Sequence, residues 1–76
     1  MEMGLERLPM GSGATVTAVN TAPALKNRLE RFGMVPGTRV VTRYRSCDGT
    51  VTAVEFRGTV IALRTRDLRD IRVTRP

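Results

Sequence analysis

The spacing of apolar residues changes once near the middle of the chain, and this change predicts a helix followed by a strand. Leu25, Leu29 and Phe32 recur at i, i+4 and i+7, which places them on one face of a short helix. Gly33 follows directly, at the position where a helix commonly ends in a left-handed residue. The sequence therefore predicts an amphipathic helix that ends near residue 32 and buries this face.

Turn residues mark both ends of this helix. Thr21 is the expected N-cap, and Pro23 falls in the first turn, where its missing N–H costs nothing. After the helix, Pro36 fixes φ and Gly37 tolerates a positive φ, so the two residues form a turn. Residues 38–44 are rich in β-branched and aromatic side chains, which predicts a strand.

The remaining segments predict further short strands. Thr and Val alternate over residues 14–20, but the apolar positions there do not keep a strict period of two. A β-bulge is therefore expected near Thr17-Ala18. Ile71 and Val73 indicate a last short strand, preceded by a polar turn that Leu68 anchors.

Two registers compete at the hairpin after residue 44. A two-residue turn at Asp48-Gly49 would place Tyr44 opposite Ala53, whereas a three-residue loop, residues 47–49, places Tyr44 opposite Thr52. The second register is preferred because it gathers apolar residues on one face, and it gives Gly49 a left-handed conformation. The expected pairs are Val40–Phe56, Thr42–Val54 and Tyr44–Thr52, then, across a turn at Arg57-Gly58, Phe56–Thr59, Val54–Ile61 and Thr52–Leu63.

Five short strands and one helix predict a mainly β fold, a small five-stranded barrel with the helix between its first and second strands. Closure would remove exposed strand edges in a chain too small to cover them otherwise. Leu5 and Leu8 are expected to pack against the edge of the core. The expected core is Val16, Leu25, Leu29, Phe32, Val40, Val54, Phe56, Ile61, Leu63, Ile71 and Val73.

Composition narrows the class of protein. The chain has 76 residues, no histidine and one cysteine, so one small domain without a disulfide or a His/Cys zinc site is expected. No apolar run has the length of a membrane-spanning helix, and the acidic N-terminal segment is unlike a signal peptide. A soluble, cytoplasmic protein is therefore expected. The net charge of +6 is nearly all arginine, which favours phosphate, carboxylate or acidic protein partners.

Residues suited to catalysis or metal binding are sparse. Cys47 stands beside Asp48, and a neighbouring carboxylate disfavours the thiolate. There is no phosphate-binding GxxxxGK[ST] loop, and Asp67 and Asp70 are interleaved with arginines rather than clustered for a cation. The sequence therefore predicts no catalytic residue, no cofactor and no metal site, and the protein is not expected to be an enzyme.

Two surface features remain as candidate binding sites. The first is a basic stripe of Arg39, Arg43 and Arg45 on the outer face of the second strand, to which Arg57 and Arg64 would add. Such a stripe on a small barrel can follow a nucleic-acid backbone, although the chain has few aromatic residues for base stacking.

The second feature is apolar. Met34, Val35 and Pro36 follow the helix and are expected to lie exposed or half-buried at its junction with the next strand. Together with the helix they would line a groove that receives a protein partner.

The order of motifs along the chain resembles a known family. The segments that carry the resemblance are Leu25, Arg28-Leu29, Gly33-Met34-Val35-Pro36-Gly37-Thr38, Val40, Gly58, Ile61-Ala62-Leu63-Arg64, Ile71 and Val73, preceded by Leu5, Leu8, Gly11, Ala14, Val16 and Val19. In this order and spacing they resemble the FeoA family of small ferrous iron transport proteins, which have an SH3-like barrel. The segment 45–50 departs from the family pattern because it contains no proline.

The resemblance implies an all-β fold, a single SH3-like domain over residues 1–76, and a role in bacterial ferrous iron uptake. The protein would be a small cytosolic accessory that binds the transporter FeoB, which carries a GTPase domain, and it would hold no iron stably itself. Weak self-association is also compatible with the apolar groove. The alternative is a basic barrel that binds nucleic acid. The residues expected to contact FeoB are Leu25, Arg28, Leu29, Met34, Val35, Pro36, Arg39, Arg43 and Arg64.

Overall fold

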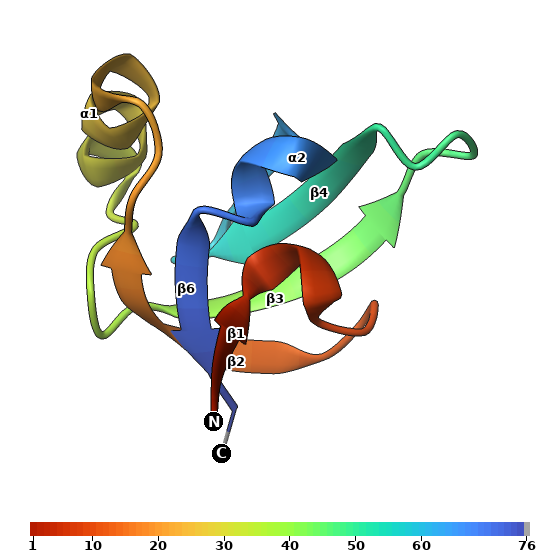
Figure 1. The fold of residues 1–76 in the computed structure, drawn as a ribbon, viewed down its shortest axis with the longest axis horizontal. Coiled ribbons are helices and arrows are strands. Elements are labelled where there is room, and N and C mark those ends of the chain that lie inside the picture. Colours follow the sequence, from red (N-terminus) through yellow and green to blue (C-terminus); the bar gives the residue numbers. More distant parts are fainter. Residues whose placement is uncertain (76) are drawn as a thin grey trace.

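A curved antiparallel sheet forms most of the molecule, and the longest helix stands beside it (Figure 1). The computed structural model describes residues 1–75. Its elements are β1 (Glu2–Gly4), the 3₁₀ helix η1 (Leu5–Arg7), β2 (Gly13–Val19), α1 (Pro23–Phe32), β3 (Arg39–Arg45), β4 (Val51–Phe56), β5 (Thr59–Arg64), α2 (Thr65–Leu68) and β6 (Ile71–Thr74). The prediction of a mainly β fold with a helix after the first long strand is confirmed.

The sheet has six strands in the order β1-β6-β2-β3-β4-β5, and over residues 1–75 its two outer strands do not pair. The expected five-stranded closed barrel is therefore corrected to an open six-stranded sheet. The additional strand is β1, in which Met3 lies opposite Val73 of β6. Three residues are too few to show an alternating pattern in the sequence, and only the pairing with β6 makes them a strand.

Strand β2 lies between β6 and β3 and pairs with both, so it joins the β1–β6 pair to strands β3, β4 and β5. Thr15 lies opposite Arg39 of β3 on one side and Thr74 of β6 on the other. Further along, the β2–β6 register shifts between Val16 and Ala18. The β-bulge predicted near Thr17-Ala18 is thus confirmed, and it bends the strand around the core.

The β3–β4 hairpin combines the two competing registers. Thr42 lies opposite Val54, as the preferred register predicts, but a bulge follows and Tyr44 lies opposite Ala53. The expected Tyr44–Thr52 pair is therefore wrong, because one extra residue in β3 shifts every later position. The loop is also longer than the expected three residues, since the Ser46 amide bonds the Val51 carbonyl at 2.8 Å.

The β4–β5 hairpin has the predicted register along its whole length. Phe56 faces Thr59, Val54 faces Ile61 and Thr52 faces Leu63, with no shift between them. Arg57 and Gly58 form the turn, with φ of 52° and 76°. Two successive positive φ angles match the twist of adjacent antiparallel strands, which is why this short turn keeps the hairpin regular.

Helix α1 ends as predicted but begins differently. Gly33 has φ of 97°; its amide bonds the Glu30 carbonyl at 3.0 Å, and the Met34 amide bonds the Leu29 carbonyl at 2.9 Å. This pair of bonds is the Schellman motif. At the other end the N-cap is Ala22, without a side-chain cap bond, so the prediction of Thr21 as N-cap is wrong.

The core differs from the predicted one around α1, and it is also larger, because Leu5, Leu8, Ala14, Val19 and Leu68 belong to it. Phe32 is 49% exposed and lies outside the core, whereas Met34 is 0% exposed and lies within it. Leu25 and Ile61 are partly buried at its margin. The core consists of Leu5, Leu8, Ala14, Val16, Val19, Leu29, Met34, Val40, Val54, Phe56, Leu63, Leu68, Ile71 and Val73.

Candidate functional site

Three of the predicted contact residues line one groove between α1 and the outer strand β5. Leu25 and Arg28 come from α1, and Arg64 comes from the end of β5. We call this the α1–β5 groove; it has a volume of about 380 Å³ and is lined by Ala22, Ala24, Leu25, Arg28, Ala62, Leu63, Arg64 and Asp67. Its other lining residues are alanines and leucines, so its walls are apolar apart from the charged groups of Arg28, Arg64 and Asp67.

Three other predicted contact residues lie on the opposite side of α1. Met34, Val35 and Pro36 line a smaller hollow, which we call the α1–β2 hollow. Its volume is about 240 Å³, and its other lining residues are Thr17, Ala18, Val19, Asn20, Lys26 and Glu30. Leu29 lies between the two hollows and is 1% exposed, so it supports both without lining either. The predicted single groove is therefore corrected to two hollows.

Met34 cannot serve as an exposed contact, because it is fully buried. The expectation of an exposed or half-buried residue is wrong for Met34 and confirmed for the half-buried Val35 and the exposed Pro36. The reason is the Schellman motif, in which the residue after the left-handed glycine packs back on the helix. Thr38 holds this turn: its hydroxyl donates to the Gly33 carbonyl at 2.8 Å and accepts from the Val35 amide at 3.2 Å.

The predicted basic stripe does not exist as a continuous surface. Arg43 forms an ion pair with Glu55 on the neighbouring strand. The bulge in β3 places Arg45 on the same face as its partner Thr52, where the still exposed side chain bonds the Thr52 hydroxyl at 3.0 Å and the Glu6 carbonyl at 3.0 Å. The prediction that Arg45 shares the outer face with Arg43 is therefore wrong.

The other arginines of the stripe have separate surroundings. Arg39 is exposed on β3 and extends its guanidinium over Gly13. Arg57 donates from Nε to the Gly33 carbonyl at 3.2 Å, which ties the β4–β5 turn to the end of α1. Arg64 forms an ion pair with Asp67 at 3.1 Å. Of the arginines predicted to form one surface, Arg43, Arg45, Arg57 and Arg64 thus each bond a different neighbour.

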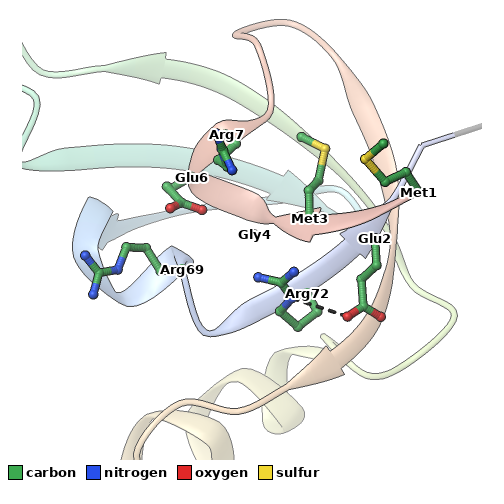
Figure 2. Close-up of a pocket in the computed structure, with 8 residues that line it drawn as sticks. All are labelled: Met1, Glu2, Met3, Gly4, Glu6, Arg7, Arg69 and Arg72. Atoms are coloured by element: carbon green, nitrogen blue, oxygen red, sulfur yellow. Dashed lines mark hydrogen bonds and ion pairs between the residues drawn. The ribbon is translucent and has the colours of Figure 1, made fainter.

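A larger hollow lies at the N-terminal strand and was not predicted from the sequence. Figure 2 shows it beside β1 and η1; its volume is about 590 Å³, and its lining residues are Met1, Glu2, Met3, Gly4, Glu6, Arg7, Arg69 and Arg72. Arg72 pairs with Glu2 at 3.3 Å. Charges of both signs alternate around the hollow, so it does not present one sign of charge to a ligand.

The hairpin loop is ordered by one carboxylate. Asp48 accepts bonds from the Thr50 amide at 3.0 Å, the Ser46 hydroxyl at 2.7 Å and the Thr50 hydroxyl at 2.8 Å. These bonds lower the pKa of Asp48 from 3.8 to about 2, with the Thr50 amide as the largest cause. Cys47 beside it is exposed. Across the described residues, no three His, Cys, Asp or Glu side chains gather where they would hold a metal ion.

Comparison with models of known protein families shows which family the chain belongs to. The model of the FeoA domain matches residues 3–75. The chain belongs to the FeoA domain family. A search of curated protein sequences finds no match for it. Among residues 1–75, the FeoA domain has no helix that is both long and apolar enough to span a membrane.

Solved structures of FeoA proteins have the same fold as this FeoA domain. The FeoA protein of Chlorobium tepidum is 30% identical with a TM-score of 0.90, and the alignment covers 93% of this chain and 68% of that one. The FeoA of Stenotrophomonas maltophilia is 27% identical with a TM-score of 0.82, over 97% and 89% of the two chains. That protein was solved with zinc and is described as an SH3 domain protein and a candidate activating factor for ferrous iron transport.

The fold also occurs inside larger proteins. A manganese-dependent transcriptional repressor matches with a TM-score of 0.85 at 16% identity, and the alignment covers 99% of this chain but 42% of the repressor. At this identity the likeness concerns the fold alone. The FeoA domain described above is thus an SH3-like fold, as the resemblance implied, with an open sheet.

Proposed function

We propose that this FeoA domain is a cytoplasmic accessory protein of bacterial ferrous iron uptake, which acts by binding the transporter FeoB. The observation that carries the proposal is the match of the FeoA family model to nearly the whole chain, residues 3–75. The relative from Stenotrophomonas maltophilia, described as a candidate activating factor for ferrous iron transport, supports the same role.

The hollows on the two sides of α1 are the proposed contact surface. Leu25, Arg28 and Arg64 line the α1–β5 groove, while Val35 and Pro36 line the α1–β2 hollow. A partner that packs on α1 would bury this apolar surface and meet arginine at its rim. Burial of apolar groups would supply affinity, and the arginines would chiefly raise the association rate.

Arg39 and Arg43 contribute less to this surface than the sequence implied. Both lie on β3, and neither lines one of the hollows beside α1. Arg43 is already paired with Glu55, so its charge is partly neutralised. We therefore place these two residues outside the main contact and assign them only a long-range electrostatic effect.

Nucleic-acid binding is the less favoured function. It requires a continuous basic surface, yet Arg43 pairs with a carboxylate, and Arg45 and Arg57 bond backbone carbonyls. Arginines held in this way neutralise fewer phosphates than free ones, and phosphate contacts supply most of the affinity of non-specific binding.

Calorimetric titration of the FeoA domain with the purified cytosolic GTPase domain of its cognate FeoB tests the proposal. We expect binding that Arg28→Glu or Val35→Asp weakens by about tenfold or more, which corresponds to about 1.4 kcal/mol. Met34→Asp would not test the contact, because a charge at the buried Met34 would unfold the protein.

The control is a matched charge reversal, Arg7→Glu. Arg7 belongs to η1 and lines the hollow of Figure 2, so this variant should leave the affinity for FeoB nearly unchanged. The proposed partner would be overturned if the wild-type domain, at about 100 µM, gave no heat of binding in the titration and no mobility shift with FeoB on a native gel. Equal losses for Arg7→Glu and Arg28→Glu would overturn the contact surface while leaving the partner in place.

A further inference from the structure

The edge of the sheet at β5 is open to an added strand. Strand β5 is the last in the sheet order, and six successive pairs with β4 run without a bulge. Proteins usually protect such edges with proline, lysine, a bulge or a covering element, because a regular edge pairs with other chains. None of these residue types occurs in β5, whose sequence is TVIALR, and Val60 on it is 52% exposed.

The backbone groups that face this edge can be identified from the hydrogen-bond pattern. The Thr65 amide donates to the Thr50 carbonyl at 2.8 Å, so the pair at these positions is hydrogen-bonded. In an antiparallel ladder bonded pairs alternate with non-bonded ones. The residues of β5 paired with β4 through both N–H and C=O are therefore Thr59, Ile61 and Leu63. Those that direct both groups to the free edge are Val60, Ala62 and Arg64.

Helix α1 lies beside this edge, and the α1–β5 groove between them borders the end of β5, from Ala62 to Arg64. At one end Arg57 bonds the Gly33 carbonyl, and at the other Ala22 and Ala24 face Ala62 across the α1–β5 groove. A groove between an edge strand and a helix is the arrangement in which several domain classes bind an extended peptide as an extra strand. Small side chains on both walls let a second backbone approach.

The charges at the groove favour an acidic occupant. Arg28 and Arg64 stand at its rim, and over residues 1–75 Arg28 forms no ion pair. Arg64 pairs with Asp67 at the surface, an interaction worth little that a second carboxylate can share. A second copy of this chain would also fit the edge, but two chains that each carry a net charge of +6 repel one another.

We infer that the α1–β5 groove binds an extended acidic segment of a partner protein, which adds to β5 as a seventh strand. The inference rests on the proposed function, since it describes how the partner in iron uptake is held. The backbone groups of Val60, Ala62 and Arg64 supply the hydrogen bonds, and Arg28 and Arg64 select carboxylates at the segment's side chains.

The first experiment titrates the labelled chain with a short acetylated and amidated peptide of alternating glutamate and valine, followed by amide-resolved NMR. We expect shifts and slowed hydrogen exchange at Val60, Ala62 and Arg64. Two further peptides carry N-methyl groups on the odd-numbered or on the even-numbered backbone nitrogens. Only one of the two should lose binding, because only every second N–H of an added strand faces β5. Equal effects of both methylated sets, or shifts confined to other elements, would overturn the inference.

A variant of the chain tests the same bonds. Ala62→Pro removes an N–H that faces the free edge and leaves the bonds to β4 intact, so it should fold and bind the peptide about tenfold more weakly. Ala62→Ser keeps the N–H and should bind as the wild type does. A peptide of alternating lysine and valine should not bind. Concentration-dependent shifts of the same amides without peptide would show self-pairing and overturn the acidic occupant.

The same variants separate this inference from the proposed function. If the cytosolic domain of FeoB binds the wild type and Ala62→Pro equally, the strand-addition inference fails and the proposed function stands. If the peptide binds as expected but the FeoB domain does not bind, the proposed function fails and the groove remains a peptide site for another acidic partner.

Discussion

At the scale of single residues, side chains that the sequence presents as surface charge hold the loops of the fold. Asp48 organises the β3–β4 loop through Ser46 and Thr50. Arg57 ties the β4–β5 turn to the end of α1, through the Gly33 carbonyl. Each of these side chains satisfies hydrogen-bonding groups that a loop cannot satisfy within its own backbone. Exposed polar residues in this protein therefore serve the structure as well as solubility.

The carboxyl group of Asp48 should titrate at unusually low pH. Its folded-state pKa, about 2, lies below the ordinary value of 3.8, so folding favours the ionised form. Its contribution to stability is thus present above the ordinary pKa and is lost as the pH falls through about 2. The chemical shift of the Thr50 amide, followed by NMR against pH, should show a midpoint near 2.

The matched variant for this titration is Ser46→Ala, which removes one of the hydroxyl donors to Asp48. Its midpoint should move upward toward the ordinary value, because fewer bonds stabilise the carboxylate. A wild-type midpoint close to 3.8 would show that the loop bonds are not formed in solution.

At the scale of elements, α1 is held by few residues. Leu29 is its one fully buried side chain, and the turn after the helix adds the buried Met34. A ten-residue helix is marginal in water without packing, so these two residues, with the partly buried Leu25, keep α1 beside the sheet. The loose attachment leaves a hollow on each side of the helix, and both candidate contact surfaces depend on it.

Replacement of apolar residues on α1 should show that the buried Leu29 contributes more to stability than the half-exposed Phe32. Leu29→Ala should lower the free energy of unfolding by about 2–5 kcal/mol, because it removes a side chain from the close-packed core. Phe32→Ala should lower it by about 1 kcal/mol or less, because half of that side chain is already exposed. Urea unfolding followed by circular dichroism measures both values.

Both substitutions end in alanine on the same helix, so helix propensity contributes similarly to each and each variant is a control for the other. A larger loss for Phe32→Ala than for Leu29→Ala would mean that Phe32 packs on the core in solution. The predicted helix face that ran from Leu25 through Leu29 to Phe32 would then be correct after all.

At the scale of the whole molecule, charge is spread over the surface rather than gathered in one stripe. The net charge is +6, yet Arg43, Arg64 and Arg72 each pair with a carboxylate. These pairs lie at the surface and add about 0–1 kcal/mol each to stability. The remaining positive charge attracts acidic partners at long range.

The proposed association with the FeoB cytosolic domain should accordingly depend on salt. Between about 0.05 and 0.5 M sodium chloride we expect the association rate constant to fall about tenfold, because counterions screen the attraction between oppositely charged surfaces. Stopped-flow fluorescence measures this rate, and the dissociation rate constant, expected to change little, is the internal control. An association rate that does not change with salt would show that the net charge plays no part in recognition.

Predictions from the sequence were correct where neighbouring residues decide the structure. Gly33 ends α1 in a left-handed conformation, Arg57-Gly58 forms a tight turn, and the bulge near Thr17-Ala18 bends β2. The β4–β5 register also follows from the alternation of buried and exposed residues. The candidate site was predicted in part: Leu25, Arg28 and Arg64 do share a groove, whereas Met34, Val35 and Pro36 lie on the other side of the helix.

The mainly β fold and the place of its helix follow from the sequence, because turn residues and apolar spacing act over a few positions. The family follows from the resemblance of the motifs, and the family model confirms it. Tertiary structure alone decided the bulge in β3 that places Arg45 on the same face as Thr52, the burial of Met34, and the pairing of β1 with β6. It also decided that the edge of β5 stays open beside α1. These features depend on contacts between segments far apart in the chain, and the free energy of such contacts is not encoded in any local pattern.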